Sequence, residues 1–545
     1  MDEINNIIIV GGGISGLYLL DLLQKKYSNL KIKLFERNAI VGGRIKTEYS
    51  NNNEINKKKT LFETGPWRIH ETHTFLLKLI DSYKLEKEKL SISYKNSEIS
   101  YTSYCNKKNN TDNGVSNINL KTLKNKKGLT ERDKLLITKG ICYVKDNENY
   151  SKTILNKDSK GILYGMNKIT NKIENGIYDN DNDNDNVNQK KKDFNKNIKL
   201  PPSININTTN ENYWIVKEGL SKIVNLLETQ YKKFIFVNHR IVEIKRINEY
   251  YELNILYRNG NNFETKIEKC KYLFIAIPPK ESAKWFIVNN YMQPLINSVD
   301  TIQLNHIYAY SKKIKSFKHN RFELFTDTEF SKTISGNYNN NWFQIGYNYG
   351  ENAKFFYRLK QNYPHLYKKI IINKFKKMGF NIPITKIKMF YWENAVHYWK
   401  PSFEFDEEKS VNKSIYPDPI NLPNCFYIGE AFSSIQGWIE GALETTNKAF
   451  NIFNSIKENN YMFKPMLLKK LPIKYEYVIV DNRVINVSKW KQVHPGSKKA
   501  IENHLFEDIS LLFRHIPHTH NSWNVLYNLQ EYWFLNGKIG FFTNI

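Results

Sequence analysis

The chain is poor in cysteine and has no long apolar run. Its 545 residues include four cysteines, none close to another and none in a C-x-x-C pair. This spacing argues against a cysteine-based zinc site and against a disulfide framework. The sequence shows no transmembrane candidate and no basic segment typical of a secretory signal. We therefore expect a cytoplasmic protein, or a virion protein if the source is a virus.

Acidic residues are scarce relative to basic ones. There are 54 Asp and Glu against 81 Lys and Arg, which gives a formal net charge of +27. Such an excess is typical of proteins that bind nucleic acids or anionic membranes. Here the basic residues are spread along the chain, and the abundance of Lys, Asn, Ile and Tyr is typical of an AT-rich genome. We therefore favour a solvated basic surface and expect no specific nucleic-acid site.

The N-terminus carries a nucleotide-binding pattern. An apolar segment that predicts a buried parallel strand is followed by a G-x-G-x-x-G motif made of Gly11, Gly13 and Gly16. The first glycine permits the tight turn, the second lets a pyrophosphate approach the backbone, and the third lets the next helix pack on the strand. Ile14 and Ser15 lie where that helix starts, and its free N–H groups attract phosphates.

An acidic residue falls at the expected distance from this motif. The second strand ends at Glu36, 20 residues after Gly16, where a carboxylate accepts hydrogen bonds from the adenosine ribose. Arg37 follows directly, and the segment 41–44, Val-Gly-Gly-Arg, predicts a tight turn that presents a fixed cation. The alternative is a glycine turn in some other βαβ unit.

Further motifs complete a resemblance to a known family. The segments 41–44, 65–68 and 424–442, together with the N-terminal motif, resemble the flavin-containing amine oxidases and especially the L-amino-acid oxidases. The resemblance covers about 1–455, apart from Asn-rich inserts. It implies an α/β fold with a Rossmann-like FAD-binding domain and an interleaved substrate domain.

The resemblance also implies how the chain divides. FAD-binding segments are expected at about 1–70, 213–285 and 420–455, and substrate-domain segments at about 71–178 and 286–419. The Asn/Asp/Lys-rich composition of about 179–200 favours a disordered insert.

Non-covalent FAD is the implied cofactor, since no cysteine lies in the segment 389–401 to tether a flavin. In the family, the backbone of the residue that matches Ile241 meets the adenine, and the residue that matches Glu430 contacts the ribityl–pyrophosphate part. The full set of expected FAD-binding residues is Gly11, Gly13, Ile14, Ser15, Gly16, Glu36, Arg37, Gly43, Arg44, Gly65, Pro66, Trp67, Arg68, Ile241, Gly429, Glu430, Gly437, Trp438 and Ile439.

Four residues are candidates for the chemistry. Arg68 matches an arginine that binds a substrate carboxylate through two parallel hydrogen bonds, although it could instead contact FAD or solvent. Trp399 and Trp438 are expected beside the flavin ring, where an aromatic cage favours flat or cationic substrates. A plain aromatic core is the alternative for Trp399. By strand register His306 stands where the family has a lysine, and it could hold a water, act as a base or be purely structural.

The C-terminus has a second signature, after an expected linker at 456–472. His494 begins the segment His-Pro-Gly-Ser, and His518 follows 24 residues later. This resembles cytochrome b5, whose axial histidines have this separation, although Ser497 replaces a second glycine. The resemblance implies a small α+β domain at 473–545 in which His494 and His518 bind the iron of haem b. His515 and His520 are rivals for the second ligand, and loss of haem is the alternative.

Together these features predict an FAD-dependent oxidoreductase. The expected substrate is a primary amine, most of all an L-amino acid, oxidised to an imine and then a keto acid. The electrons pass to O2, to a redox partner protein or to the fused haem. The alternatives are a desaturase or isomerase acting on a non-amine, and a non-catalytic FAD/haem relay. The sequence leaves the oligomeric state open.

Overall fold

The structure is a computed structural model. It describes residues 5–50, 60–90, 100–102, 198–199, 213–312, 321–326, 330, 332–336, 341–377, 382–400, 402–467, 470–472 and 474–544. The insert expected at about 179–200 lies outside the described residues, apart from two of its last residues. Most of the expected substrate-domain segment 71–178 also lies outside them.

A seven-stranded sheet forms the centre of the FAD-binding region. Its order is β10-β2-β1-β13-β12-β11, and β20 pairs with β13. The parallel strands are β1 (Asn5–Val10), β2 (Ile32–Phe35), β10 (Ile235–Phe236), β13 (Asn262–Ile275) and β20 (Cys425–Tyr427). The antiparallel ones are β11 (His239–Ile247) and β12 (Tyr250–Asn259). Residues 7–9 of β1 are fully buried, as expected for a strand covered on both faces.

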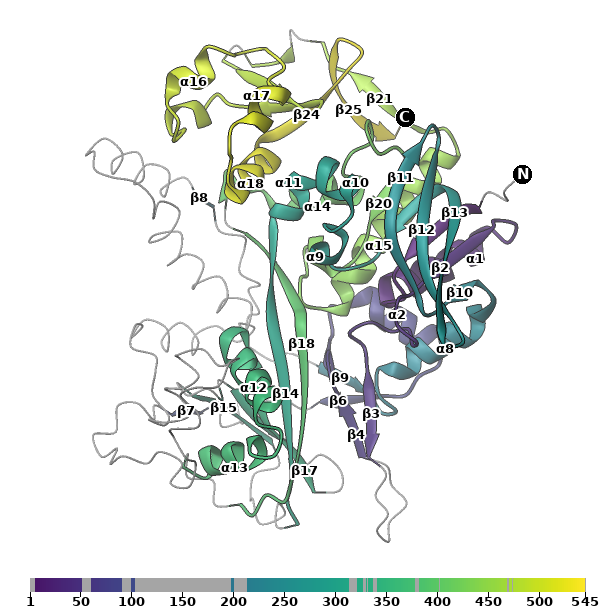
Figure 1. Ribbon diagram of the computed structural model, residues 1–545, viewed down its shortest axis with the longest axis vertical. Helices are drawn as coiled ribbons and strands as arrows, with labels where there is room; N and C mark the ends of the chain where they lie inside the picture. Colours follow the sequence, from purple (N-terminus) through teal and green to yellow (C-terminus); the bar gives the residue numbers. More distant parts are fainter. Residues whose placement is uncertain are drawn as a thin grey trace, which may run out of the picture.

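Helices cover both faces of this sheet (Figure 1). One buried cluster joins it to α1 (Ile14–Lys26), α2 (Thr74–Ser82), α8 (Ser221–Tyr231) and α15 (Ile439–Lys457). A second cluster lies on the other face and includes residues of α10 (Phe286–Tyr291), α11 (Gln293–Asn297), α14 (Glu407–Ile415) and η3 (Glu430–Phe432). The short helices α9 (Pro279–Ser282) and η1 (Lys232–Phe234) connect strands of the sheet to these layers.

A long antiparallel sheet connects the FAD-binding region to the rest of the substrate region. Its order is β17-β14-β18, with β14 (Val299–Tyr310), β17 (Trp342–Tyr349) and β18 (Lys386–Trp399). In Figure 1 β14 and β18 run from the neighbourhood of α11 to that of α13. Two helices pack on this sheet, α12 (Gly350–Asn362) and α13 (Tyr367–Lys377).

Smaller sheets complete this part of the chain. One pairs β3 (Thr47–Ser50) with β4 (Thr60–Glu63), and another has β9 (Tyr213–Val216) between β5 (Ile69–His70) and β6 (Lys87–Leu90). The remaining strands are β7 (Ser100–Thr102), β15 (Arg321–Thr326) and β16 (Lys332–Gly336) in one sheet, and β8 (Ile198–Lys199) with β19 (Ser402–Phe403) in another.

The C-terminal unit is a five-stranded sheet with short helices. Its strands are β21 (Tyr461–Pro465), β25 (Lys538–Asn544), β24 (Gln530–Leu535), β23 (Arg483–Asn486) and β22 (Tyr477–Val480), in that order. Its helices are η5 (Trp490–Gln492), α16 (Lys498–Glu502), α17 (Ser510–His515) and α18 (His520–Leu529). The segment 456–472 is therefore more than the expected linker, because β21 pairs with the last strand of the chain.

The observed architecture confirms the predicted mixture of an α/β and an α+β fold. The apolar run 234–244 is broken at Asn238, whose φ is +58°, so that β10 pairs with β2 while β11 pairs with β12. β13 is one continuous strand, whose first part, residues 262–270, pairs with β12 and whose end, residues 270–275, pairs with β1. Among the described residues, no helix is long and apolar enough to cross a membrane.

Candidate active site and haem-binding site

A cavity of about 440 Å³ opens at the carboxyl ends of β1 and β2. In open α/β sheets ligands bind at this edge. Segments far apart in the sequence contribute to its wall: the β1–α1 turn, the end of β2, the Gly42–Arg44 turn, β11, β18 and the start of α15.

The glycine turn fits a bound pyrophosphate. Gly11 has a φ of +114°, and a Cβ there would come within 2.5 Å of the Ala276 carbonyl oxygen. A Cβ on Gly16 would come within 2.1 Å of the Gly11 carbonyl oxygen, which explains the close helix packing. Gly13 lines the cavity, and a Cβ there would meet nothing within 4 Å. It is also the N-cap of α1 and provides no side-chain cap, so the N–H groups of the first turn are available to phosphate oxygens.

Glu36 is fixed at the end of β2. Its Oε2 accepts a hydrogen bond from the Gly12 amide (2.9 Å), and its Oε1 accepts one from the Asn38 amide (2.8 Å). Arg37 also lines the cavity, and its guanidinium pairs with Glu281 at 2.9 Å. These bonds orient the carboxylate at the place where the sequence predicts contact with a ribose.

The Gly42–Arg44 turn lies against the phosphate-binding turn. Gly42 forms a bridge with Gly13, and its amide donates to the Gly12 carbonyl at 2.7 Å. The φ angles of Gly42 and Gly43 are +109° and +59°, a conformation that favours glycine. The turn places the Arg44 side chain on the cavity wall, where its Nη1 donates to the Ala395 carbonyl at 2.8 Å.

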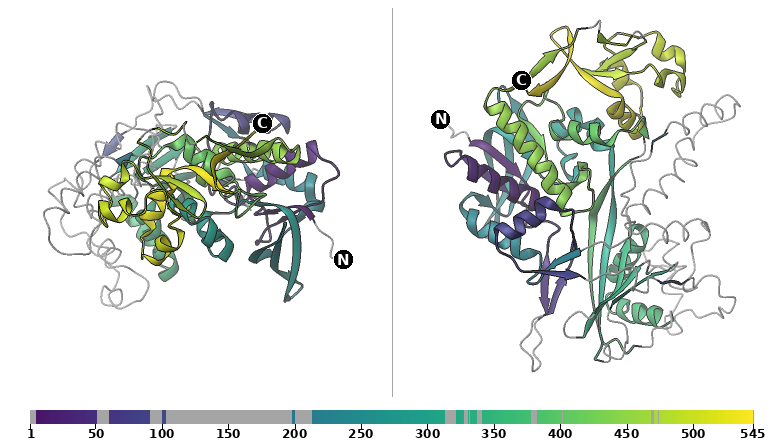
Figure 2. Two further views of the ribbon diagram at one scale, coloured as in Figure 1. Left: turned by 90° about the horizontal axis from the view of Figure 1, so that it is seen from above. Right: turned by 180° about the vertical axis from the view of Figure 1, so that it is seen from behind.

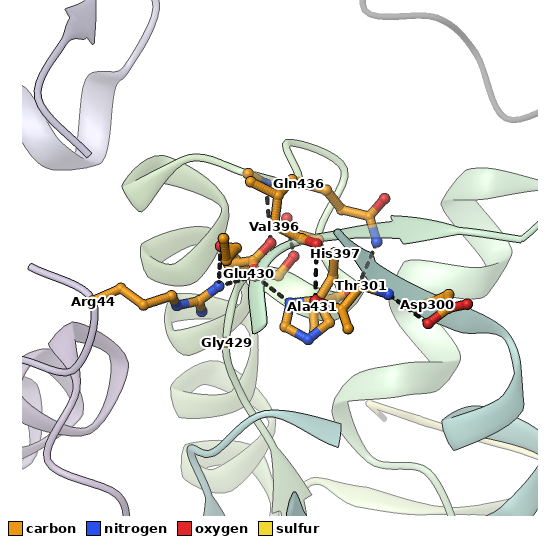
Figure 3. Close-up of polar contacts among 12 residues, drawn as sticks. Arg44, Asp300, Thr301, Val396, His397, Gly429, Glu430, Ala431 and Gln436 are labelled. Carbon is orange, nitrogen blue, oxygen red and sulfur yellow. Dashed lines mark hydrogen bonds and ion pairs between the residues drawn. The ribbon is translucent and has the colours of Figure 1, made fainter. Parts of the chain in front are cut away.

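Glu430 joins three elements inside the protein (Figure 3). Its Oε1 accepts hydrogen bonds from Arg44 Nη1 and His397 Nδ1, each at 2.5 Å, and its Oε2 accepts one from the Gly437 amide at 2.9 Å. Burial alone would raise the pKa of this carboxyl, but the Arg44 guanidinium and the His397 ring outweigh burial and hold it well below its ordinary value. The carboxylate is therefore ionised at neutral pH.

The sequence interpretation missed His397. It is buried and lines the cavity, and its Nε2 has no hydrogen-bond partner among the described residues. It lies on β18 two residues before Trp399 and thus on the same face of that strand. Strand alternation could have found the pair, but the partnership with Glu430 depends on tertiary packing.

The start of α15 forms another part of the wall. Gly437, Trp438 and Ile439 line the cavity, and Trp438 is an N-cap without a side-chain hydrogen bond. Glu440 lies in the first turn of α15, but its carboxylate accepts hydrogen bonds from the amides of residues 75 and 76 in a different helix, α2. A second helix N-terminus therefore faces the cavity, where it favours negative charge on a bound group.

The aromatic side chains on the cavity wall include Tyr347, Trp392 and Trp438. Trp392 Nε1 donates to the Thr64 carbonyl at 2.6 Å, which fixes its ring beside Gly65. Trp438 packs edge-on against His73, with ring centroids 4.8 Å apart. The sequence interpretation had named Trp438 but not Trp392 or Tyr347.

Several predicted residues lie outside the cavity wall. Gly16 packs against the turn, and Trp67 and Arg68 are absent from the lining. The Arg68 guanidinium lies between the rings of Trp67 and Tyr213, at 4.9 and 5.1 Å from their centroids. Its orientation is therefore set by aromatic neighbours.

Trp399 is a core residue. It does not line the cavity, and its Nε1 donates to the Ser433 carbonyl at 3.1 Å. Its ring packs against Phe405, Phe432 and Tyr527. This packing favours the alternative of a plain aromatic core for Trp399, and Trp392 of the same strand lies on the cavity wall.

His306 is fully buried behind Tyr347, with ring centroids 4.7 Å apart, and does not line the cavity. Its Nδ1 lies 3.1 Å from Gln344 Nε2. Burial lowers the pKa of His306 to about 3, so the imidazole is neutral at physiological pH. In this structure His306 is a buried strand residue, which favours the structural role among the alternatives that the sequence left open.

The residues on the wall fit FAD. The open space at Gly13, the two helix N-termini and the oriented Glu36 carboxylate match a dinucleotide, and Ile241 lies on the wall for an adenine. Of the expected binding residues, those on the wall are Gly11, Gly13, Ile14, Ser15, Glu36, Arg37, Gly43, Arg44, Gly65, Pro66, Ile241, Gly429, Glu430, Gly437, Trp438 and Ile439.

The two predicted haem ligands have matching environments in the C-terminal unit. His494 Nδ1 donates to the Ser497 carbonyl at 3.1 Å, and His518 Nδ1 donates to the Phe513 carbonyl at 2.8 Å. In a neutral imidazole this leaves Nε2 as the unprotonated nitrogen, which is the atom an iron binds. Phe513 stacks on His518 with centroids 4.0 Å apart. The donor set therefore fits a bis-histidine haem.

The apolar surroundings of these histidines are partly open. Leu526 is buried, Leu505 and Phe513 are partly buried against the same core, and Phe506 is 56% exposed. His515 and His520, the rival ligands, are both exposed. Ser497, in place of the second glycine, has a φ of +126°.

Comparisons with known proteins agree with both sites. The sequence model described as "Flavin containing amine oxidoreductase" matches residues 14–313, and that described as "Cytochrome b5-like Heme/Steroid binding domain" matches residues 469–538. No curated protein matches the chain.

A solved structure shares the fold. A crystal structure titled "Putative protoporphyrinogen oxidase" from Exiguobacterium sp. 255-15 superposes with a TM-score of 0.50 at 12% identity, covering 84% of this chain and 100% of that one. The identity is too low to transfer an activity. The cofactors are FAD and, in the C-terminal cytochrome b5-like domain, haem b. Because the first match spans more than half of its length, the chain belongs to the flavin-containing amine oxidoreductase family.

Proposed function

We propose that this FAD-dependent oxidoreductase removes two hydrogens from a primary amine, and that its preferred substrate is an L-amino acid. The imine that forms reacts with water to give a keto acid and ammonia. FAD, when bound, supplies a two-electron acceptor for the hydride that leaves the amine carbon. The protein's own residues bind, orient and shield the reactants.

The single observation that best supports an amine substrate is the aromatic part of the cavity wall. Tyr347, Trp392 and Trp438 all belong to the cavity wall. Aromatic faces attract cations, and such a set favours a cationic or flat substrate over an aliphatic neutral one. The hydrogen bond from Trp392 to the Thr64 carbonyl fixes one of these rings in place before substrate binds.

Arg68 is the residue we propose for the substrate carboxylate. It lies two residues after Pro66, which lines the cavity. Stacking on Trp67 and Tyr213 limits the guanidinium to few orientations. A planar guanidinium held in this way can grip a carboxylate through two parallel hydrogen bonds.

The fused haem domain supports a role in accepting electrons. A bis-histidine haem has no open coordination position and is suited to one-electron transfer. We propose that electrons leave reduced FAD either to O2 or, one at a time, to this haem.

A panel of amino acids, each paired with the amine that lacks its carboxylate, tests the assignment. We expect ammonia and keto acid in equal amounts from at least one amino acid. We expect Arg68→Lys to raise KM for that acid while KM for the matched amine stays unchanged. Lys245→Ala, a surface cation outside the cavity, is the control. No ammonia from any member of the panel would contradict the proposal.

A second candidate is an FAD enzyme that acts on a non-amine, such as a desaturase or isomerase. Arg68 and His306 are the candidates for binding a carboxylate and for acting as a base, and neither lines the cavity. This observation favours the second candidate. The structural neighbour's title names an oxidase of a different kind, protoporphyrinogen oxidase. A non-catalytic FAD/haem relay remains the third reading, and FAD that no candidate substrate reduces would favour it.

A further inference from the structure

The boundary between the C-terminal unit and the flavin unit includes buried side chains contributed by both. Units within one chain move relative to each other by default, unless their interface is extensive and apolar. In Figure 1 and at the right of Figure 2 the C-terminal unit lies at one end of the molecule, against the flavin unit, and Figure 1 places α18 beside α11 and α14.

Each unit contributes an aromatic residue to the core of the other. Tyr527 of α18 is 3% exposed and belongs to the flavin unit's buried cluster, where it stacks on Trp399 with an interplanar angle of 16°. Phe403 of β19 is 1% exposed and belongs to the buried cluster of the C-terminal unit, where its ring packs against Trp490. Separating the units would expose both rings to water.

A buried ion pair crosses the same boundary. Arg483 of β23 donates from Nη2 to Asp418 Oδ2 at 2.8 Å, and the two side chains are 3% and 0% exposed. The same Nη2 donates to the Tyr291 carbonyl at 2.8 Å. Separation would leave each charge without its partner, and a buried pair of this kind favours one relative position over others.

The end of α18 is also held by the flavin unit. Lys413 of α14 donates to the carbonyls of Tyr527 and Gln530, which lie at the C-terminus of that helix. The Tyr527 hydroxyl donates to the Ser410 carbonyl at 2.6 Å. α18 begins two residues after His518, so these contacts fix the helix that directly follows the predicted haem ligand.

We propose that the haem-binding unit is locked in one position on the flavin unit by Tyr527, Phe403 and the Arg483–Asp418 pair, and does not act as a mobile carrier. The proposal rests on the proposed transfer of electrons to the haem. In that transfer one electron leaves reduced FAD and converts ferric haem to ferrous haem. A one-electron acceptor outside the chain must remove it before the second electron follows.

The first test uses the full-length wild-type protein with both cofactors, without oxygen. FAD is photoreduced, so that no amine is needed, and the appearance of ferrous haem is followed. A locked unit predicts a first-order rate that is independent of protein concentration and of solvent viscosity. A rate that falls in proportion to added sucrose or glycerol would overturn the proposal.

The second test measures docking itself. Thermal unfolding is followed at the haem absorption and at the FAD fluorescence of the full-length protein. We expect coincident transitions in wild type and in Lys489→Ala, which removes an exposed ion pair across the same boundary. We expect Arg483→Met to separate them, with the haem unit lost at the lower temperature. Coincident transitions in Arg483→Met, unchanged from wild type, would overturn the proposal.

Two substitutions at Tyr527 test the same docking if the Arg483→Met variant fails to fold. Tyr527→Phe keeps the ring on Trp399 and loses only the hydroxyl, whereas Tyr527→Ala removes the ring. We expect the transitions to stay coincident in the first variant and to separate in the second. These outcomes do not depend on any substrate, so failure of the amine assignment and failure of docking are distinguishable.

Discussion

Arg44 and Glu430 are 386 residues apart in the sequence and meet inside the cavity wall at 2.5 Å. The same carboxylate binds His397 of β18 and the Gly437 amide before α15. One side chain thus holds together the glycine turn, the long substrate sheet and a helix N-terminus. The cavity depends on this carboxylate for its shape as well as for its charge.

Replacement of Glu430 by glutamine tests that dependence. The amide cannot balance the Arg44 guanidinium, and loss of one partner of a buried charge pair costs about 3 kcal/mol. We expect the free energy of unfolding of the FAD-free protein to fall by about that amount. Chemical denaturation measures it, and Lys26→Ala, which removes a surface pair, serves as control. A loss no larger than that of the control would contradict the role of Glu430.

Glu36 is predicted to govern FAD affinity rather than stability. Its carboxylate is oriented by the amides of Gly12 and Asn38. A hydrogen bond to a charged group contributes about 1.5–3 kcal/mol, so Glu36→Ala is expected to raise the FAD dissociation constant about tenfold to a hundredfold. Fluorescence titration of the FAD-free protein measures this. Glu218→Gln, an exposed carboxylate outside the cavity, should leave the constant unchanged.

The buried histidines predict a loss of stability in acid. Burial lowers the pKa of His306 to about 3, while the unfolded chain keeps the ordinary value of 6.5. Between these values the unfolded state binds more protons, so the stabilisation is complete above pH 6.5 and is lost as pH falls toward 3. His73, also buried, has its pKa lowered to about 3 and adds the same dependence.

The difference between wild type and His306→Gln isolates this effect from other titrating groups. Across the same pH range we expect the free energy of unfolding of wild type to fall more steeply than that of the variant, by up to about 1.4 kcal/mol per pH unit. Denaturant titrations at a series of pH values measure the two slopes. Equal slopes would show that His306 is accessible to protons in the folded protein.

Ser497 occupies a backbone conformation that suits glycine. Its φ and ψ are +126° and 158°, a region that is costly for residues with a Cβ, at about 1–3 kcal/mol. Its hydroxyl caps α16 through the Ala500 amide, which Ser497→Gly would lose at a cost of a few tenths of a kcal/mol. We expect Ser497→Gly to raise the melting temperature that is followed at the haem absorption of the full-length protein.

Ser497→Ala is the matched control, because it keeps the strained backbone and loses the cap. We expect it to lower the melting temperature. A higher melting temperature for alanine than for glycine would show that the backbone is not strained at this position.

Local motifs were predictable because their physics is local. The G-x-G-x-x-G turn, the spacing to Glu36 and the Gly42–Arg44 turn each depend on a few consecutive residues. The two histidines of the cytochrome b5 signature were assigned for the same reason and stay a prediction. In the structure these residues lie on the cavity wall or beside backbone carbonyls that orient them.

Residues on long strands were placed less well. Strand register decides whether a side chain faces the cavity or the core, and a small error moves it from one to the other. Trp399 and His306 were assigned to the site by analogy, but the structure buries both. His397 and Trp392 lie on the wall because β18 pairs with β14, and the partnership of His397 with Glu430 depends on tertiary packing that a local pattern does not reveal.

The most direct test of the account is the visible spectrum of the protein with both cofactors, recorded without oxygen before and after addition of amino acids and polyamines. We predict that at least one amine bleaches the FAD absorption and that the spectrum of ferrous haem then appears. Bleaching of the FAD absorption without haem reduction would mean that the fused domain does not accept electrons from FAD. FAD absorption that no amine bleaches, in a protein whose FAD is still reduced by light, would contradict the assignment as an amine oxidoreductase.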